Sequence, residues 1–354
     1  VMVFGSPAKG KSSSAKTQAY WLCGAFGYRL LAIDVKGEYL DMAALLGVPV
    51  LSLHPGGQAR VNPLDSDGSD KGNQARNAFV LALASTMTGR SLTSLEALLL
   101  DKTVDLVTQR NPSAVLSDVL EVLMNPPDEL CSRLRKDPQS LLDGTADARY
   151  GLMRLVEGSA AGMFDGPSTV AVDPQRGLVV DVSPCKTDDQ LLRLSMLAGM
   201  RAIEQILARV THRTLALNDE TWRLGTTVET AEWLRHRFKL GRVDALSNWA
   251  MVHRASDLSS GDEGSRLDKV GKSMVGDCDT KILFAAGKVE DARAQVELLG
   301  LPESVVDMLM KFPQGRALVC CGEQYRSVVQ FTRSATLTRL TDTNQAISRT
   351  DMDL

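Results

Sequence analysis

Apolar residues along this chain follow two patterns, and the change between the patterns divides the sequence. Short apolar runs that end at a polar residue or a glycine predict buried strands. Three such runs lie near the start: residues 1–4, a run that ends near Asp34, and a run within GVPVLSLHPGG. Between the first two runs, the pattern from Lys11 to about Ala25 is helical. This alternation of strand and helix predicts a parallel α/β sheet.

The pattern is then helical, without a strong strand, from about Gly72 to Gly162. Apolar residues at helical spacing occur in QARNAFVLALASTM, SLTSLEALLLDKTVDLVTQ, AVLSDVLEVLM and DARYGLMRLVEG. Ser91 and Ser113 stand where the N-caps of two of these helices are expected. This region therefore predicts an all-helical insertion in the α/β domain.

Strand patterns return after the helical region, beginning at RGLVVDVS, and a long helix is predicted from about Asp188 to Arg209. Further strands are predicted in RTLALNDETW, SNWAMVHRASDL, TKILFAA, RALVCCG and SVVQF. We therefore expect residues 1–71 and 166–332 to form one α/β domain, residues 72–165 to form the insertion, and residues 333–354 to be a polar tail.

Composition and charge narrow the class of protein. The chain has 354 residues, of which 44% are hydrophobic and 23% charged, as in an ordinary globular protein. A net charge of -3 gives no overall attraction to nucleic acid or to an anionic membrane, although local basic patches stay compatible with DNA binding. No apolar run reaches the roughly 18 residues that suggest a membrane span. The six cysteines lack C-x-x-C spacing and the four histidines are scattered, which indicates a reducing, cytoplasmic environment and no metal cluster.

The first candidate site is the stretch GSPAKGKS, which fits the phosphate-loop pattern G-x-x-x-x-G-K-[ST] between a predicted strand and a helix. Gly5 and Gly10 allow the backbone to turn its N–H groups toward a phosphate. Lys11 would neutralise the β- and γ-phosphates, and the Ser12 hydroxyl would bind Mg²⁺. The expected phosphate-binding segment comprises Gly5, Ser6, Pro7, Ala8, Lys9, Gly10, Lys11, Ser12 and Ser13. The sequence therefore predicts an ATP and Mg²⁺ site.

The second candidate site is a pair of adjacent carboxylates, Asp219 and Glu220, directly after the apolar run Leu215–Leu217. Carboxylates at the end of a buried strand are costly unless they face a polar site. Hydrolysis in a phosphate-loop enzyme needs a ligand for Mg²⁺ and a base for the attacking water. We expect Asp219 to hold Mg²⁺ and Glu220 to be the general base.

Two further stretches, IDVKGEY and RVNPLD, follow the second and third predicted strands. With the phosphate loop, NDETWRL and VHRASDL, they give the chain an order of motifs that resembles the FtsK–HerA branch of phosphate-loop NTPases. Within that branch it resembles the VirB/TraC-type ATPases of type IV secretion and conjugation. The resemblance implies a RecA-like fold with an all-helical insertion, and ATP hydrolysis that powers DNA or protein transfer.

The resemblance also suggests roles for residues outside the phosphate loop. Glu38 would orient water or Lys11, or else cap a turn. The family expects a polar sensor of the γ-phosphate, often glutamine, where this chain has His253, and a packed histidine is the alternative. An arginine from a neighbouring subunit would complete the site, with Arg254, Arg316 and Arg201 as candidates.

Members of this family work as hexamers at the inner face of the cell membrane, joined to other secretion components through a separate N-terminal domain. The chain begins four residues before the phosphate loop, so we expect that domain to be absent and this core to be monomeric. Two alternatives to a secretion motor stay open. One is a HerA/FtsK-type DNA pump, which DNA would stimulate directly. The other is a nucleotide-gated assembly module with little turnover, which the Asp219–Glu220 pair argues against.

Overall fold

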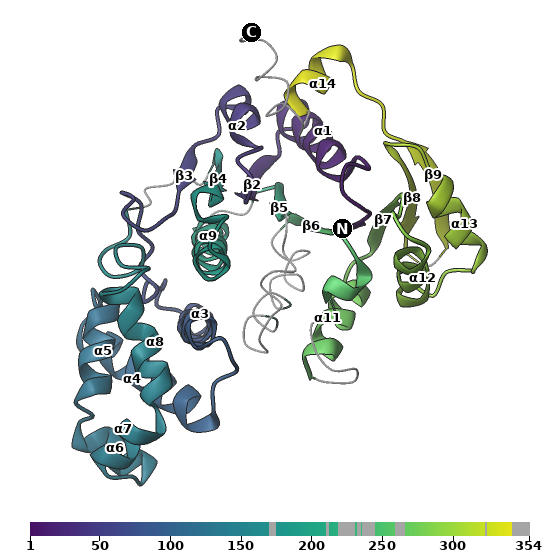
Figure 1. Ribbon diagram of the computed structural model, residues 1–354. Helices are drawn as coiled ribbons and strands as arrows, with labels where there is room; N and C mark the ends of the chain where they lie inside the picture. Colours follow the sequence, from purple (N-terminus) through teal and green to yellow (C-terminus); the bar gives the residue numbers. More distant parts are fainter. Residues whose placement is uncertain are drawn as a thin grey trace.

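The computed structural model describes residues 1–169, 175–209, 212–218, 231, 235, 245–258, 266–322 and 324–341. Its described residues form a nine-stranded sheet with helices on both faces (Figure 1). In spatial order the strands are β3 (Val50–Ser52), β4 (Gly177–Asp181), β2 (Arg29–Asp34), β5 (Thr214–Asn218), β6 (Leu246–Val252), β1 (Met2–Phe4), β7 (Thr280–Phe284), β8 (Arg316–Cys321) and β9 (Tyr325–Gln330).

Neighbouring strands from β3 to β7 are parallel, and β8 and β9 extend the sheet as antiparallel strands. The expectation of a mainly parallel sheet is therefore confirmed. The chain passes from β1 to β2 through α1 (Lys11–Gly24), and β5 and β6 later insert between these two strands. The carboxyl ends of β1, β6, β5 and β2 consequently meet at one edge, where open α/β sheets bind their ligands.

Alternating residues of the strands supply two hydrophobic cores, one on each face of the sheet. On one face, Leu30 and Ala32 of β2 pack with Ala15 and Ala19 of α1 and with α2 (Leu40–Leu46). On the other face, Leu31 and Ile33 join a larger core that includes α9 (Asp189–Arg209). Burial on both faces explains why the central strands are continuous apolar runs in the sequence.

Along the chain, a block of helices follows β3 and precedes β4. It projects to one side of the sheet, although β3 and β4 are neighbours within it (Figure 1). No strand occurs among residues 53–169, all of which the structure describes. The helices are α3 (Asp70–Thr88), α4 (Ser94–Arg110), α5 (Leu116–Met124), α6 (Asp128–Leu134), α7 (Pro138–Gly144) and α8 (Ala146–Val156). The chain enters and leaves the block through two adjacent segments, because Val61 N donates to Met163 O at 2.9 Å.

The N-P-L segment forms part of this entry to the helical block. The Asn62 side chain donates to Ala114 O at 2.9 Å and accepts the backbone N–H of Leu64 at 3.0 Å. Its backbone N–H in turn donates to the Ser168 hydroxyl at 2.8 Å. Asn62 therefore joins the helical block to the two segments that connect it with the sheet.

Two predicted helix caps are wrong by two residues. Thr93, not Ser91, caps α4: its hydroxyl accepts Glu96 N at 3.2 Å, and the Glu96 carboxylate accepts Thr93 N at 2.7 Å. Helix α5 begins after Val115, not at Ser113. In both helices an acidic residue three positions after the cap accepts the cap's own N–H, and in α4 the Thr93 hydroxyl completes a reciprocal pair of bonds.

The carboxyl-terminal part of the described chain packs beside β7–β9 and α1 (Figure 1). Its helices are η3 (Ala255–Leu258), α11 (Arg266–Gly276), α12 (Val289–Leu298), α13 (Ser304–Lys311) and α14 (Ala335–Thr341), whereas the short helix η1 (Ser183–Cys185) joins β4 to α9. Helix α14 contacts α1 and buries Leu337, so part of the expected polar tail is docked on the domain. Among the described residues, no helix combines the length and the apolar composition that crossing a membrane requires.

Candidate nucleotide-binding site

The predicted phosphate loop connects β1 to α1 and turns through three positive φ angles. Gly5 has φ +148°, Ala8 +59° and Gly10 +108°. A side chain at Gly5 would place its Cβ 2.7 Å from the Cβ of Phe284, so only glycine fits there. Pro7 and Ala8 at the top of the loop are exposed. Helix α1 then begins without a side-chain cap and without an acidic residue in its first turn, which suits an anion at that end.

Neighbouring strands hold the loop from the side of the sheet. Ser6 N donates to Ala285 O at 3.1 Å, and the Ser6 hydroxyl accepts Gly287 N at 2.6 Å. On the other side of the loop, Gly315 N donates to Lys9 O at 3.0 Å. These bonds come from the segments that follow β7 and precede β8, so the antiparallel end of the sheet braces the loop.

Lys11 is buried within the loop, with 5% of its surface exposed. Its ammonium donates to Gly5 O, to Ser6 O at 3.0 Å and to His253 Nδ1 at 3.1 Å. Because an ammonium has only donors, His253 Nδ1 is the acceptor of this hydrogen bond. The structure thus brings together two residues that the sequence placed 242 positions apart.

His253 reaches Lys11 because β6 lies next to β1 in the sheet. The two strands are parallel and in register, with Phe4 opposite Val252. Gly5 and His253 therefore leave their strands at the same level, and the expected sensor position is beside the phosphate loop. The structure thus places His253 next to Lys11, and its role as a sensor of the γ-phosphate stays a prediction.

Glu38 pairs with Lys16 of α1, not with Lys11. Glu38 Oε2 lies 3.2 Å from Lys16 Nζ, and the Lys16 side chain is 1% exposed. Lys16 Nζ also lies 5.3 Å from the centre of the Tyr39 ring. The sequence reasoning missed Lys16; its position four residues after Ser12, on a helix face otherwise rich in small residues, was the available signal.

Asp34 at the end of β2 shapes the loop that carries Glu38. Its carboxylate accepts the backbone N–H groups of Lys36 at 3.2 Å, Glu38 at 3.0 Å and Tyr39 at 2.7 Å. Gly37 allows this tight turn with φ +74°. Burial raises the pKa of Asp34 above its usual range, and the three N–H donors oppose that rise.

The three candidate arginines have different environments. Arg254 follows His253, is 56% exposed, and its Nε lies 3.8 Å from Asp291 Oδ1 on α12. Arg316 is exposed at the start of β8, where its Nε donates to Gln330 at 3.2 Å. Arg201 is 4% exposed and donates within the chain to Glu204 at 2.9 Å and to Asp65 O at 2.6 Å. Burial thus argues against Arg201 as a residue that completes a neighbouring site.

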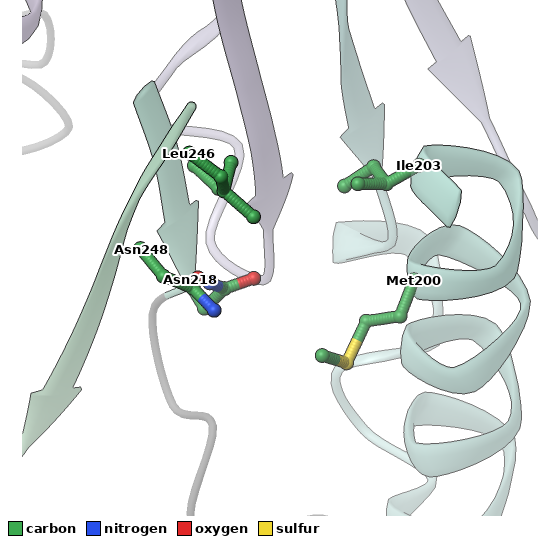
Figure 2. Close-up of a pocket in the computed structure, with 6 residues that line it drawn as sticks. Met200, Ile203, Asn218, Leu246 and Asn248 are labelled. Atoms are coloured by element: carbon green, nitrogen blue, oxygen red, sulfur yellow. Dashed lines mark hydrogen bonds between the residues drawn. The ribbon is translucent and has the colours of Figure 1, made fainter. Parts of the chain in front are cut away.

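Asp219 and Glu220 lie outside the described residues, directly after the last residue of β5, Asn218. The Asn218 side chain donates to Asn248 Oδ1 at 2.7 Å across the β5–β6 pair. Figure 2 shows both amides at a small pocket, with Met200 and Ile203 of α9 across from them. This bond fixes the end of β5 against β6.

The chemistry of the described residues fits a bound nucleotide with Mg²⁺. Lys11 supplies a buried cation, and Ser12 and Ser13 are partly exposed in the first turn of α1. Within the described ranges, no group of three or more His, Cys, Asp or Glu could hold a metal by itself. A cation here would thus depend on Ser12, on Asp219 and on the phosphates, which is how Mg²⁺ is usually held in such enzymes.

Comparison with known proteins identifies the fold. No protein-family model and no curated protein matches the sequence. Among solved structures, VirB4 of Thermoanaerobacter pseudethanolicus aligns over 96% of this chain and 90% of its own, with 21% identity and a TM-score of 0.77. The plasmid coupling protein TrwB is similar in its complex with ADP and Mg²⁺ (14% identity, 94% and 85% of the two chains, TM-score 0.67). It is also similar in its complex with an ATP analogue (16%, 94% and 85%, TM-score 0.65).

The mainly parallel sheet and the phosphate loop between β1 and α1 are thus those expected from the sequence, whereas the strand order comes from the structure alone. The described chain has the RecA-like fold of phosphate-loop NTPases, in the arrangement that VirB4 and TrwB share.

Proposed function

We propose that this protein is an ATP-hydrolysing motor that powers conjugative transfer of DNA or protein through a type IV secretion system. The observation that carries the proposal is the position of Lys11. Its ammonium is buried at the start of α1, inside a loop of strained backbone, and contacts His253 from the adjacent strand. A buried cation at an uncapped helix start is suited to the phosphates of ATP.

Each residue of the site has a separate role in the proposed hydrolysis. Lys11 would exchange the carbonyl oxygens of Gly5 and Ser6 for the β- and γ-phosphates, and the uncapped start of α1 would face the same anion. Ser12 and Asp219 would hold Mg²⁺, and the ion would neutralise charge that develops on the phosphates. His253 contacts the γ-phosphate, and Glu220 takes a proton from the attacking water.

The role in transfer rests on the likeness to VirB4 and to TrwB, a bacterial conjugative coupling protein. We place the protein at the cytoplasmic face of the inner membrane, in a hexameric ring with other secretion components. In that ring Arg254, exposed beside His253, supplies the charge that completes a neighbouring site. Contact with DNA is part of the same proposal.

An ATPase assay of the Lys11→Ala variant tests the nucleotide site. We expect hydrolysis to fall to the background level, because the phosphates lose their buried counter-charge. Lys71→Ala, which removes an exposed lysine at the start of α3, is the matched control and should keep the wild-type rate. Equal rates for wild type and Lys11→Ala would overturn the proposal.

Measuring the same rates with and without DNA addresses the transfer role. A rate that rises on addition of DNA, in wild type but not in Lys11→Ala, is expected if the motor acts on DNA. The rise should disappear at high salt, since phosphate contacts by Lys and Arg weaken as salt increases.

A further inference from the structure

We propose that Lys16 is a positioning residue for hydrolysis: its ammonium holds the Glu38 carboxylate beside the phosphate end of the site, where Glu38 orients the attacking water. This inference rests on the proposed ATPase function and adds a residue to it. Lys16 belongs to none of the motifs that define the site, and its role follows from its burial, its partner and its place on α1.

The burial of Lys16 is the first step. A lysine side chain ordinarily keeps its ammonium in water, because burying an unpaired charge is costly. The Lys16 side chain is 1% exposed, and its ammonium is paired with Glu38 and lies over the Tyr39 ring. The burial of the Lys16 ammonium therefore costs free energy, and the ion pair that offsets this cost holds the Glu38 carboxylate.

The place of Lys16 on α1 is the second step. Lys16 follows Ser12 by four residues, so the two lie one turn apart on the same face of the helix. Side chains of a helix lean toward its N-terminus, and a long one covers the preceding turn. The Lys16 ammonium is thus directed toward the Ser12 turn, at the end of α1 where the phosphates are expected.

The attachment of Glu38 from two directions is the third step. Asp34 accepts the backbone N–H of Glu38 and of its neighbour Tyr39, which fixes the loop at the end of β2. Lys16 fixes the side chain through Oε2. Within the described part of the chain Oε1 has no hydrogen-bond partner, and the side chain is 18% exposed, so this oxygen is available to accept from water. The Glu38 carboxylate is thus fixed through its backbone and through Oε2, while Oε1 is free to accept a hydrogen bond from water. This arrangement preorganises it as an acceptor.

The test compares Lys16→Met and Glu38→Gln with wild type in steady-state ATP hydrolysis. Methionine keeps much of the buried chain of Lys16 and removes the charge, and glutamine keeps the shape of Glu38. We expect each variant to lower kcat by about tenfold or more and to leave KM for ATP within about twofold, since only the orientation of water is lost. The double variant should be no slower than the slower single variant, because the two residues act as a unit.

A merely structural ion pair would give a different result. It would lower the melting temperature and leave kcat of the folded enzyme unchanged, so thermal unfolding by circular dichroism is measured beside the kinetics. If Lys16→Met does not fold, Glu38→Gln decides, and full kcat in that variant overturns the inference. Hydrolysis that depends on Lys11 but is unaffected by both variants overturns only this inference. A wild-type protein without Lys11-dependent hydrolysis overturns the proposed function as well.

Discussion

Glu220 is the residue on which the proposed chemistry depends most, and it lies outside the described part of the chain. We predict that Glu220→Gln still binds ATP and Mg²⁺ but does not turn over, because the variant loses the base and keeps Asp219 for the metal. Equilibrium binding of a fluorescent ATP analogue, measured beside the hydrolysis rate, separates these two effects. Unchanged turnover would assign the base to another carboxylate, with Glu38 the first to examine.

The six cysteines give a second prediction at the scale of single residues. Cys321 is the exposed thiol, whereas burial raises the pKa of Cys23 to about 12. At pH 8 a thiol with that pKa is about one part in ten thousand thiolate, the reactive form. Burial also raises the pKa of Cys185, Cys278 and Cys320.

We therefore expect one fast thiol in the native protein when it is titrated at pH 8 with an aromatic disulfide reagent. Cys321→Ser should abolish that fast phase, and Cys23→Ser should leave it intact. In denaturant all six thiols should react. A fast phase that survives in Cys321→Ser would contradict the assignment.

At the scale of elements, the start of α4 shows how a helix boundary is chosen. Thr93 and Glu96 bond reciprocally, and Glu96 also accepts from Arg90 at 2.8 and 2.9 Å. Thr93→Ala removes the acceptor for Glu96 N and should lower the free energy of unfolding by about 1 kcal/mol. Ser91→Ala, two residues earlier at an exposed position, is the control and should change it by less than about 0.5 kcal/mol.

Urea unfolding followed by circular dichroism measures both variants of α4. A larger loss in Ser91→Ala than in Thr93→Ala would show that α4 begins elsewhere in solution. The helical block as a whole joins the sheet through residues 60–65 and 162–169, where the Ser168 hydroxyl accepts the backbone N–H of Asn62 and donates to the Asp65 carboxylate. The boundaries 72–165 of the insertion stay a prediction, and the observed helices α3–α8 span Asp70–Val156.

At the scale of the whole molecule, the expected arginine that completes the site comes from a neighbouring copy of the chain. Arg254 is exposed, its Nε lies 3.8 Å from Asp291 Oδ1, and it directly follows His253, which contacts Lys11. If a neighbouring copy supplies the missing charge, basal hydrolysis by dilute protein should be slow. We predict that specific activity rises with protein concentration.

Light scattering across the same concentration series tests the assembly directly. A mainly monomeric chain at low micromolar concentration, with activity that rises as larger species form, is expected. Arg254→Ala should remove the rise and leave the activity of the dilute protein unchanged. Specific activity that is constant across the series, or a stable hexamer at the lowest concentration, would contradict this prediction.

Local patterns were sufficient to predict the strands, the longer helices and the phosphate loop, but not short helices such as α2, α6 and α7. The run MVF, the glycines at 5 and 10 and the helix from Lys11 lie within a few residues of one another, so their geometry follows from backbone chemistry alone. The apolar runs identified the nine strands, because each central strand is buried on both faces and cannot contain many polar residues. Motif order was enough to predict a RecA-like sheet with a helical block.

Tertiary structure decided which of the distant residues meet. His253 contacts Lys11 because β6 lies next to β1 in register, although β6 comes about 240 residues later in the chain. Lys16 pairs with Glu38, and not with solvent, because α1 packs against β2 and α2, which brings its ammonium to Glu38 and over the Tyr39 ring. Arg201 on α9 lies over the Phe79 ring of α3 and donates to Asp65 O, so it is buried against the helical block. In the sequence it could not be told apart from the exposed arginines. Such pairings join segments far apart in the chain, and burial and partner choice are properties of the packed molecule that no local pattern contains.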